Sequence, residues 1–189
     1  MGYDHDASWE RLETLLKSKK KNKEKWSDLV DYHFSKEDAI GLSLKDINIE
    51  KDVEELRDWI TKLFRTEPIP PNTDAIWIGV FKATYENREI YASYCIGSTQ
   101  YTESNIEWAT EPTYMPENRY FVIDGVNELL SIINDSDDRF AFLDWILPLG
   151  YYCFILSDIV VQCTLYNDLL PDGIHIVCGY DEGDYIELT

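Results

Sequence analysis

Basic residues are scarce in the second part of this chain. Residues 66 to 189 contain 4 Lys plus Arg against 21 Asp plus Glu, whereas residues 1 to 65 contain 13 against 15. The net charges are therefore −17 and −2, which sum to −19. Because phosphate binding needs Lys and Arg, this balance disfavours a nucleic-acid ligand. Two interpretations of the surplus stay open: an acidic surface that aids solubility, and one that attracts a basic partner.

The sequence also lacks an uninterrupted run of about 18 apolar residues, the length that spans a membrane. Its most apolar stretch, Leu143 to Leu156, is interrupted by Asp144, Pro148 and Gly150. The first ten residues are polar and include two aspartates, where a secretory signal needs basic residues followed by an apolar run. We therefore expect no membrane association and no export by that route, and we predict a cytoplasmic protein.

No catalytic motif is recognisable, since the chain has neither a Gly-x-Ser-x-Gly elbow nor a phosphate-binding glycine loop. His175, between two isoleucines of an expected strand, is interpreted as structural. The cysteines lie in apolar runs without the two-residue gap of a zinc knuckle or redox dithiol, which is typical of reduced core residues. They are Cys95, Cys153, Cys163 and Cys178. We predict no catalytic residue, no metal and no cofactor, and thus no enzyme.

Two acidic turns, Asp135 to Asp138 and Asp181 to Asp184, offer oxygen ligands for a hard cation. Neither matches the twelve-residue calcium loop. Carboxylates beside glycine are typical of hairpin turns on a solvated surface, so a turn is the preferred interpretation at both places.

Helical spacing of apolar residues predicts a helical N-terminal part. Ala7 to Tyr32 is expected to be helical, with the basic run Lys17 to Lys25 as a solvated helix face or a connector. Ile49 to Phe64 carries a continuous apolar stripe, and Pro68 to Asn72 then ends the helical part.

From Ala75 the pattern changes to that of strands. Ala75 to Lys82 and Glu89 to Ile96 predict an antiparallel hairpin, and Arg119 to Ile123 a third strand. Ile174 to Tyr180 and Tyr185 to Leu188 predict a second hairpin.

Between these strands we expect helices near Val126 to Asn134 and Arg139 to Leu147. Gly150 to Asn167 fits a strand or a helix, and a buried helix is favoured. The sequence thus predicts an α+β fold, a mainly antiparallel sheet packed with several helices after an N-terminal helical segment. We expect a single domain over residues 1–189, with a helical part at 1–65 and a sheet-containing part at 75–189.

A long polar connection, Thr99 to Asn118, is of a length that is usually functional or disordered. Its aromatic residues Tyr101, Trp108 and Tyr114 indicate that it is ordered. Trp108 is framed by acidic residues, which leaves two interpretations open. It is either an interface anchor with a charged rim or a plug at the edge of the domain's own core.

A pattern over about residues 76 to 188 resembles small uncharacterised bacterial proteins that are similar to the immunity proteins of polymorphic and contact-dependent toxins. It consists of Gly97-Ser98, Tyr101, Trp108-Ala109, Pro112-x-Tyr114-x-Pro116, Arg119-Tyr120 and Gly179-Tyr-Asp-Glu-Gly-Asp184. The resemblance implies a cytoplasmic protein that binds one cognate toxin and blocks it, and it supplies no catalytic residue. An acidic surface would suit a basic toxin such as a nuclease.

The first hypothesis is therefore a protein-binding inhibitor with an acidic, aromatic-anchored surface. Its expected contact residues are Glu103, Glu107, Trp108, Glu111, Asp181, Glu182 and Asp184. Two alternatives stay open: an enzyme built from scattered carboxylates and His175, with or without a divalent cation, and an adaptor or structural subunit. The oligomeric state is left open. Strand order decides whether the loop at Trp108 and the turn at Asp181 are neighbours.

Overall fold

The computed structural model describes residues 4–134, 139–165, 169–181 and 183–189. Packing divides the chain into two compact units. Unit 1 comprises Met1–Asp52 and Asp124–Ile155, and unit 2 comprises Val53–Ile123 and Leu156–Thr189. That the whole chain forms a single domain stays a prediction.

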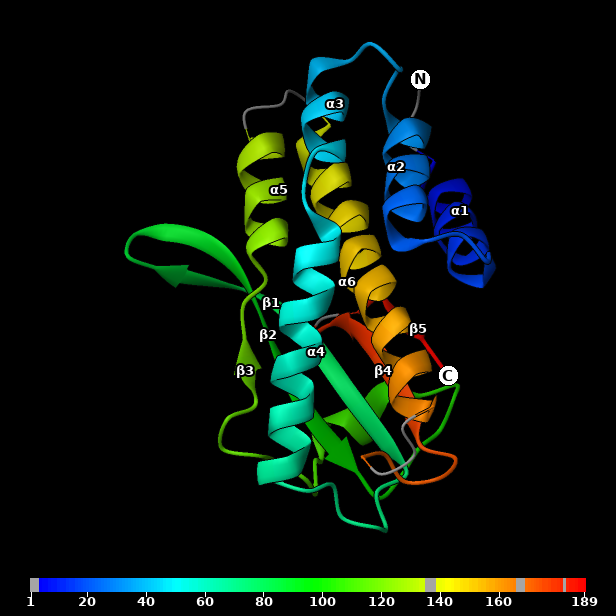
Figure 1. Cartoon of the computed structure of the whole chain (residues 1–189), viewed down its shortest axis with the longest axis vertical. Helices are drawn as coiled ribbons and strands as arrows, with labels where there is room; N and C mark the ends of the chain where they lie inside the picture. Colours follow the sequence, from blue (N-terminus) through cyan, green and yellow to red (C-terminus); the bar gives the residue numbers. More distant parts are fainter. Residues whose placement is uncertain (1–3, 135–138, 166–168, 182) are drawn as a thin grey trace. The chain divides into compact units, whose positions relative to one another are not determined.

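Unit 1 is helical (Figure 1). It contains α1 (His5–Lys17), α2 (Asn22–His33), α3 (Ala39–Lys45) and α5 (Asp124–Asn134). It also holds the start of α4 (Ile49–Thr66) and the first part of α6 (Phe140–Leu165). The helical prediction over Ala7 to Tyr32 is confirmed on both sides of an interruption, because the chain is extended at Ser18 and at Lys21. The basic run therefore includes a connector, one of its two expected roles.

A short helix, α3, was not predicted. Asp38 caps it by accepting hydrogen bonds from the backbone N–H groups of Ile40 and Gly41. Seven residues are too few for a clear helical period, so the cap was its main signal.

Trp26 lies at the centre of unit 1 and is fully buried. Its indole Nε1 donates to the carbonyl oxygen of Leu44 at 2.7 Å, and its ring meets that of Tyr151 edge to face at 5.0 Å. A Cβ atom at Gly150 would lie 2.6 Å from Leu29, so this glycine lets α6 approach α2 closely.

α6 is one continuous helix where two were expected. Pro148 lies inside it, at a cost of about 3 kcal/mol in a helix interior. The neighbouring Leu147, Leu149 and Tyr151 are each 0% exposed, and burying such side chains stabilises by roughly 1.5–3 kcal/mol apiece. Burial thus outweighs the proline, and the favoured helix over Gly150 to Asn167 is confirmed as far as Leu165.

Phe140–Val160 of α6 is the one helical stretch of the described residues that is long and apolar enough to cross a membrane by length and composition. Of its most apolar part, 72% is buried inside the protein, as in the core helix of a soluble protein.

Unit 2 contains a five-stranded sheet, which confirms the α+β class. Its strands are β1 (Ala75–Tyr85), β2 (Arg88–Ser98), β3 (Tyr120–Phe121), β4 (His175–Tyr180) and β5 (Tyr185–Glu187). The order is β3-β2-β1-β4-β5, and both predicted hairpins are present. The sheet is mixed, because β1 and β4 pair in parallel while the other neighbours are antiparallel.

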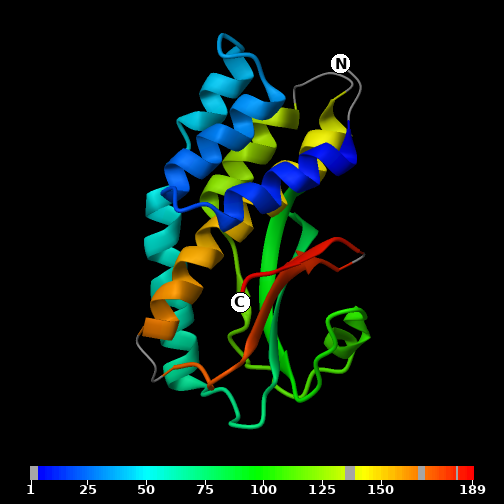
Figure 2. The same ribbon diagram turned by 90° about the vertical axis from the view of Figure 1, so that its right-hand side faces the viewer.

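The two faces of this sheet are covered differently. Figure 2 shows α4 and the last part of α6, from Leu156, on one face and the short 3-10 helix η1 (Ile106–Thr110) on the other. On the helix-covered face, Trp59 of α4 meets Phe121 of β3 at 4.3 Å between ring centroids. We call the face that carries Trp77 and η1 the aromatic face.

The partly buried imidazole of His33 in unit 1 makes stability depend on pH. Burial lowers the pKa of His33 from 6.5 to about 4, and its Nε2 has no hydrogen-bond partner among the described residues. The folded state therefore binds the proton less tightly than the unfolded state, so stability is full above pH 6.5 and falls toward pH 4. At pH 5 we expect a loss of about 2 kcal/mol from this residue.

The measurement is urea unfolding of the wild type and of His33→Gln at pH 7.5 and pH 5. Carboxylates act equally in both proteins, so the difference between the two pH dependences isolates His33. Equal losses on acidification would contradict this account.

Candidate functional site

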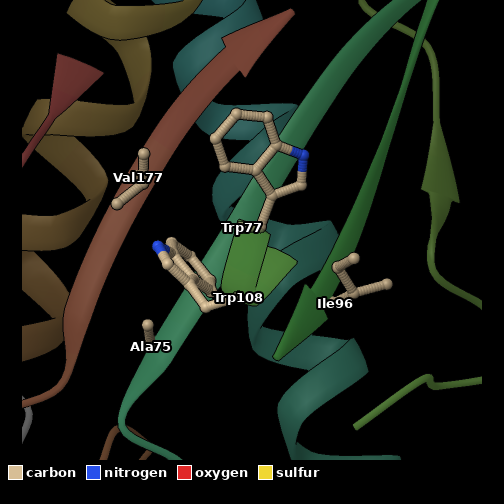
Figure 3. Packing of buried hydrophobic residues seen from close by; sticks show 5 residues of the cluster. All are labelled: Ala75, Trp77, Ile96, Trp108 and Val177. Atoms are coloured by element: carbon tan, nitrogen blue, oxygen red, sulfur yellow. The ribbon is translucent and has the colours of Figure 1, made fainter. Parts of the chain in front are cut away.

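Trp108 lies in the core of the aromatic face (Figure 3). It packs with Ala75, Trp77, Ile96 and Val177, and only 8% of it is exposed. Its ring centroid is 6.2 Å from that of Trp77 in an edge-to-face arrangement. The structure thus supports the second interpretation of Trp108, a plug on its own core. Its part in partner binding stays a prediction.

Two glycines leave room for rings to lie across the strands. Gly79 and Gly179 are paired in register on β1 and β4. A Cβ atom at Gly79 would lie 2.3 Å from Cζ of Tyr94, and one at Gly179 would lie 2.7 Å from Cη2 of Trp77. Because side chains normally fill these positions, the glycines let both rings contact the backbone.

Tyr94 reaches across Gly79 to the β4–β5 turn. Its hydroxyl donates a hydrogen bond to Oδ1 of Asp181 at 2.6 Å. Burial, and then this hydrogen bond, raise the pKa of Tyr94 far above its ordinary value. The phenol therefore stays a donor at any physiological pH and holds Asp181 in place.

The acidic loop and the β4–β5 hairpin are neighbours. The Tyr185 hydroxyl donates to the carbonyl oxygen of Glu103 at 3.2 Å, and the Tyr101 hydroxyl donates to Oε2 of Glu187 at 2.7 Å. Strand order alone would not have shown this, because the loop has to fold back over Trp77.

These contacts join two segments that together carry five of the predicted acidic contact residues. We call this set the acidic face: Glu103, Glu107, Glu111, Asp181 and Asp184. All five are exposed, and neither residues 99–118 nor residues 169–189 contain a Lys or Arg. Glu182 lies outside the described residues, as does the other acidic turn, Asp135 to Asp138.

A His–Glu pair lies beside the acidic face. Nδ1 of His175 is 2.6 Å from Oε1 of Glu187, and the Tyr101 ring stacks on the imidazole at 3.9 Å and 11°. Burial opposes ionisation of Glu187, but the hydrogen bonds from His175 and Tyr101 outweigh it and lower the pKa of this carboxyl. Sequence reasoning interpreted His175 as structural and did not pair it with Glu187, twelve residues away.

The far end of the long connection is held by Glu67, just after α4. Its carboxylate accepts hydrogen bonds from the backbone N–H of Glu117 at 2.5 Å and of Asn118 at 3.2 Å. Its carbonyl oxygen accepts from the Tyr114 hydroxyl at 2.6 Å. Hydrogen bonds from the Asn118 side chain and the Glu117 backbone lower the pKa of Glu67. These bonds, with the packing of Tyr101 and Trp108, confirm that the connection is ordered.

A polar cleft of about 610 Å³ opens within the same connection. Its lining comprises Ser98, Gln100, Asn105, Glu107, Trp108 and Glu111, together with four threonines. Three of these residues were predicted contact residues, but the cleft itself was not predicted. Among the described residues, no group of three or more His, Cys, Asp or Glu side chains is arranged to hold a metal ion.

Comparison with protein-family models, curated proteins and solved structures found no match to this chain. The resemblance to immunity proteins therefore stays a hypothesis. The fold defines an α+β protein with a mixed five-stranded sheet, and its function has to be argued from the acidic face and the groups beside it.

Proposed function

We propose that this chain is a protein-binding inhibitor that captures a basic partner on the acidic face of unit 2, as an immunity protein captures its cognate toxin. The observation that carries the proposal is the contact of Tyr185 with Glu103. This contact places two acidic segments side by side, and neither segment contains a basic residue.

The acidic face is supported by hydrogen bonds from three tyrosines, which suits binding. Tyr94 holds Asp181, and Tyr101 and Tyr185 hold the loop. Groups fixed before association lose little conformational freedom on binding, so more of the interaction energy appears as affinity. Complementary charge also speeds the encounter with a basic partner, and the effect weakens as salt rises.

A cytoplasmic location is part of the proposal. Cys95, Cys153 and Cys178 are buried thiols outside any disulfide, as is usual for proteins of a reducing compartment. Burial raises the pKa of the Cys95 thiol to about 12, so this side chain is an unreactive core residue.

The test is capture of partners from the native lysate by the tagged protein at low and high salt. We expect one basic protein that high salt releases. The variant Glu103→Lys/Glu111→Lys should bind that protein at least about tenfold more weakly, a change of roughly 1.4 kcal/mol.

The matched control is Glu10→Lys/Glu37→Lys, which makes the same change of charge at two exposed positions of unit 1. It should bind like the wild type apart from a small effect of net charge. If both double variants weakened partner binding equally, the loss would come from net charge and not from the acidic face, and the proposed site would be refuted.

One observation favours a second function, that of an enzyme with a general base. The imidazole of His175 is half-exposed, and its Nδ1 is hydrogen-bonded to the carboxylate of Glu187, which orients the ring. In enzymes, a carboxylate placed in this way fixes the tautomer of a catalytic histidine. A metabolite and metal screen of the wild type against His175→Ala tests it. Turnover that disappears in the variant would support the enzyme, and no turnover in either protein would count against it.

A further inference from the structure

The cleft beside Trp108 has the chemistry of a cation site. None of its lining residues is Lys, Arg or His, and all of them except Trp108 carry an oxygen that can accept a hydrogen bond. Two of them, Glu107 and Glu111, are carboxylates. An anionic ligand would find no positive charge in this lining, whereas a cation would meet two negative charges.

Two donors of the lining are used within the loop. The Thr110 hydroxyl donates to the carbonyl oxygen of Glu107 at 2.7 Å. Nδ2 of Asn105 donates to the carboxylate Oε2 of Glu107 at 3.0 Å. Nine of the ten lining side chains carry acceptor oxygens, and two of these side chains are carboxylates, so acceptors and negative charge predominate in the cleft. The ligand that fits this surplus is one with many donors and few acceptors.

Glu111 adds an uncommitted charge. Its exposed carboxylate has no hydrogen bond or ion pair within the described part of the chain. A guanidinium group suits this arrangement, because it is planar, permanently charged and carries five N–H donors that match carboxylates in pairs. A sugar brings as many acceptors as donors and would leave the two carboxylates without a counter-charge.

We propose that this cleft is a guanidinium site, which an arginine side chain of the bound partner fills in the complex. The inference rests on the proposed function for the identity of the occupant, since the partner supplies the arginine. The chemistry of the cleft can be tested without the partner. A volume of about 610 Å³ admits a whole arginine side chain.

The experiment titrates the 189-residue chain with N-acetyl-arginine amide at low salt and follows the backbone amide signals by NMR. We expect saturable shifts confined to residues 98–113, with a Kd on the order of 1 mM for so small a probe. N-acetyl-citrulline amide, which has nearly the same shape and no charge, should bind at least tenfold more weakly.

Glu107→Gln and Glu111→Gln should each weaken the arginine probe by threefold or more. Glu117→Gln, in the same connection but outside the lining, should leave it unchanged. The NMR spectra also show that each variant is folded. Equal binding of the citrulline probe, shifts away from residues 98–113, or preferential binding of maltose in the cleft would each overturn the guanidinium site.

The two proposals fail separately. If the wild type captures a basic partner from the lysate but the arginine probe does not bind in the cleft, only the guanidinium site is refuted. If the probe binds in the cleft and no partner is captured, the guanidinium site stands and the inhibitor function is refuted.

Discussion

Replacement of Asp52 by alanine is expected to lower the free energy of unfolding by about 3 kcal/mol. Asp52 is 3% exposed at the start of α4. Its Oδ2 accepts hydrogen bonds from the Tyr151 hydroxyl at 2.6 Å and from the backbone N–H of Gly125 at 3.1 Å. Alanine would leave both donors buried without this acceptor, and each unsatisfied donor costs roughly 1–3 kcal/mol.

The geometry leaves little room for repair. A Cβ atom at Gly125 would lie 2.1 Å from Oδ2 of Asp52 and 2.4 Å from the Tyr151 hydroxyl, so the three groups are in direct contact. Burial, and then the hydrogen bond to Asp52, raise the pKa of Tyr151 far above its ordinary value, so the phenol remains the donor.

Urea denaturation of the wild type, Asp52→Ala and Asp52→Asn measures the effect. Asparagine keeps one acceptor oxygen and should lose less than alanine. The control is Asp124→Ala, which removes an exposed carboxylate paired with Lys51 and should cost about 0.5 kcal/mol. A loss below 1 kcal/mol for Asp52→Ala would show that the buried hydrogen bonds contribute little.

Elements with a strong, unbroken period could be predicted from the sequence. The apolar stripe of α4 and the two strands of the β1–β2 hairpin, rich in β-branched and aromatic residues, were placed within a few residues of their ends. The sequence could not show that α6 continues through Pro148, because the stabilisation comes from burial of its neighbours. Nor could it show the parallel pairing of β1 and β4, since strands of either direction carry the same local pattern.

The candidate site was predictable only in part. Charge and aromatic content singled out the loop around Trp108 and the turn at Asp181, but their contact depends on hydrogen bonds between residues more than 80 positions apart. The pairing of His175 with Glu187 had a weaker signal, because the register of a short hairpin places Glu187 diagonally across from His175. The cleft had no signal in the sequence, because its shape depends on how the loop folds over the sheet.

A side chain at Gly79 is expected to uncouple the aromatic face from the β4–β5 turn. In Gly79→Val the new Cβ would lie 2.3 Å from Cζ and 2.6 Å from the hydroxyl of Tyr94, so the ring has to leave the strand. The hydrogen bond to Asp181 is then lost together with the packing of the ring. Overpacking and the loss of a hydrogen bond to a charged group together give an expected cost of about 3 kcal/mol.

The physical cause can be isolated by a double-mutant cycle. If the clash with the ring is responsible, Gly79→Val should cost at least 1 kcal/mol less in a Tyr94→Ala background than in the wild type. Gly183→Ala is the matched control, because nothing lies within 4 Å of the added Cβ, and its stability should stay within about 0.5 kcal/mol of the wild type. Additive costs for Gly79→Val and Tyr94→Ala would mean that the strand itself rejects the side chain.

The same variant connects the fold to the proposed function. The Tyr94 hydroxyl holds Asp181 in the acidic turn by a hydrogen bond, so displacement of the Tyr94 ring frees Asp181 without changing any charge. If a fixed acidic face is what binds the basic partner, Gly79→Val should weaken capture at low salt although its net charge equals that of the wild type. Unchanged capture by a folded Gly79→Val protein would mean that charge alone, and not the position of Asp181, determines the affinity.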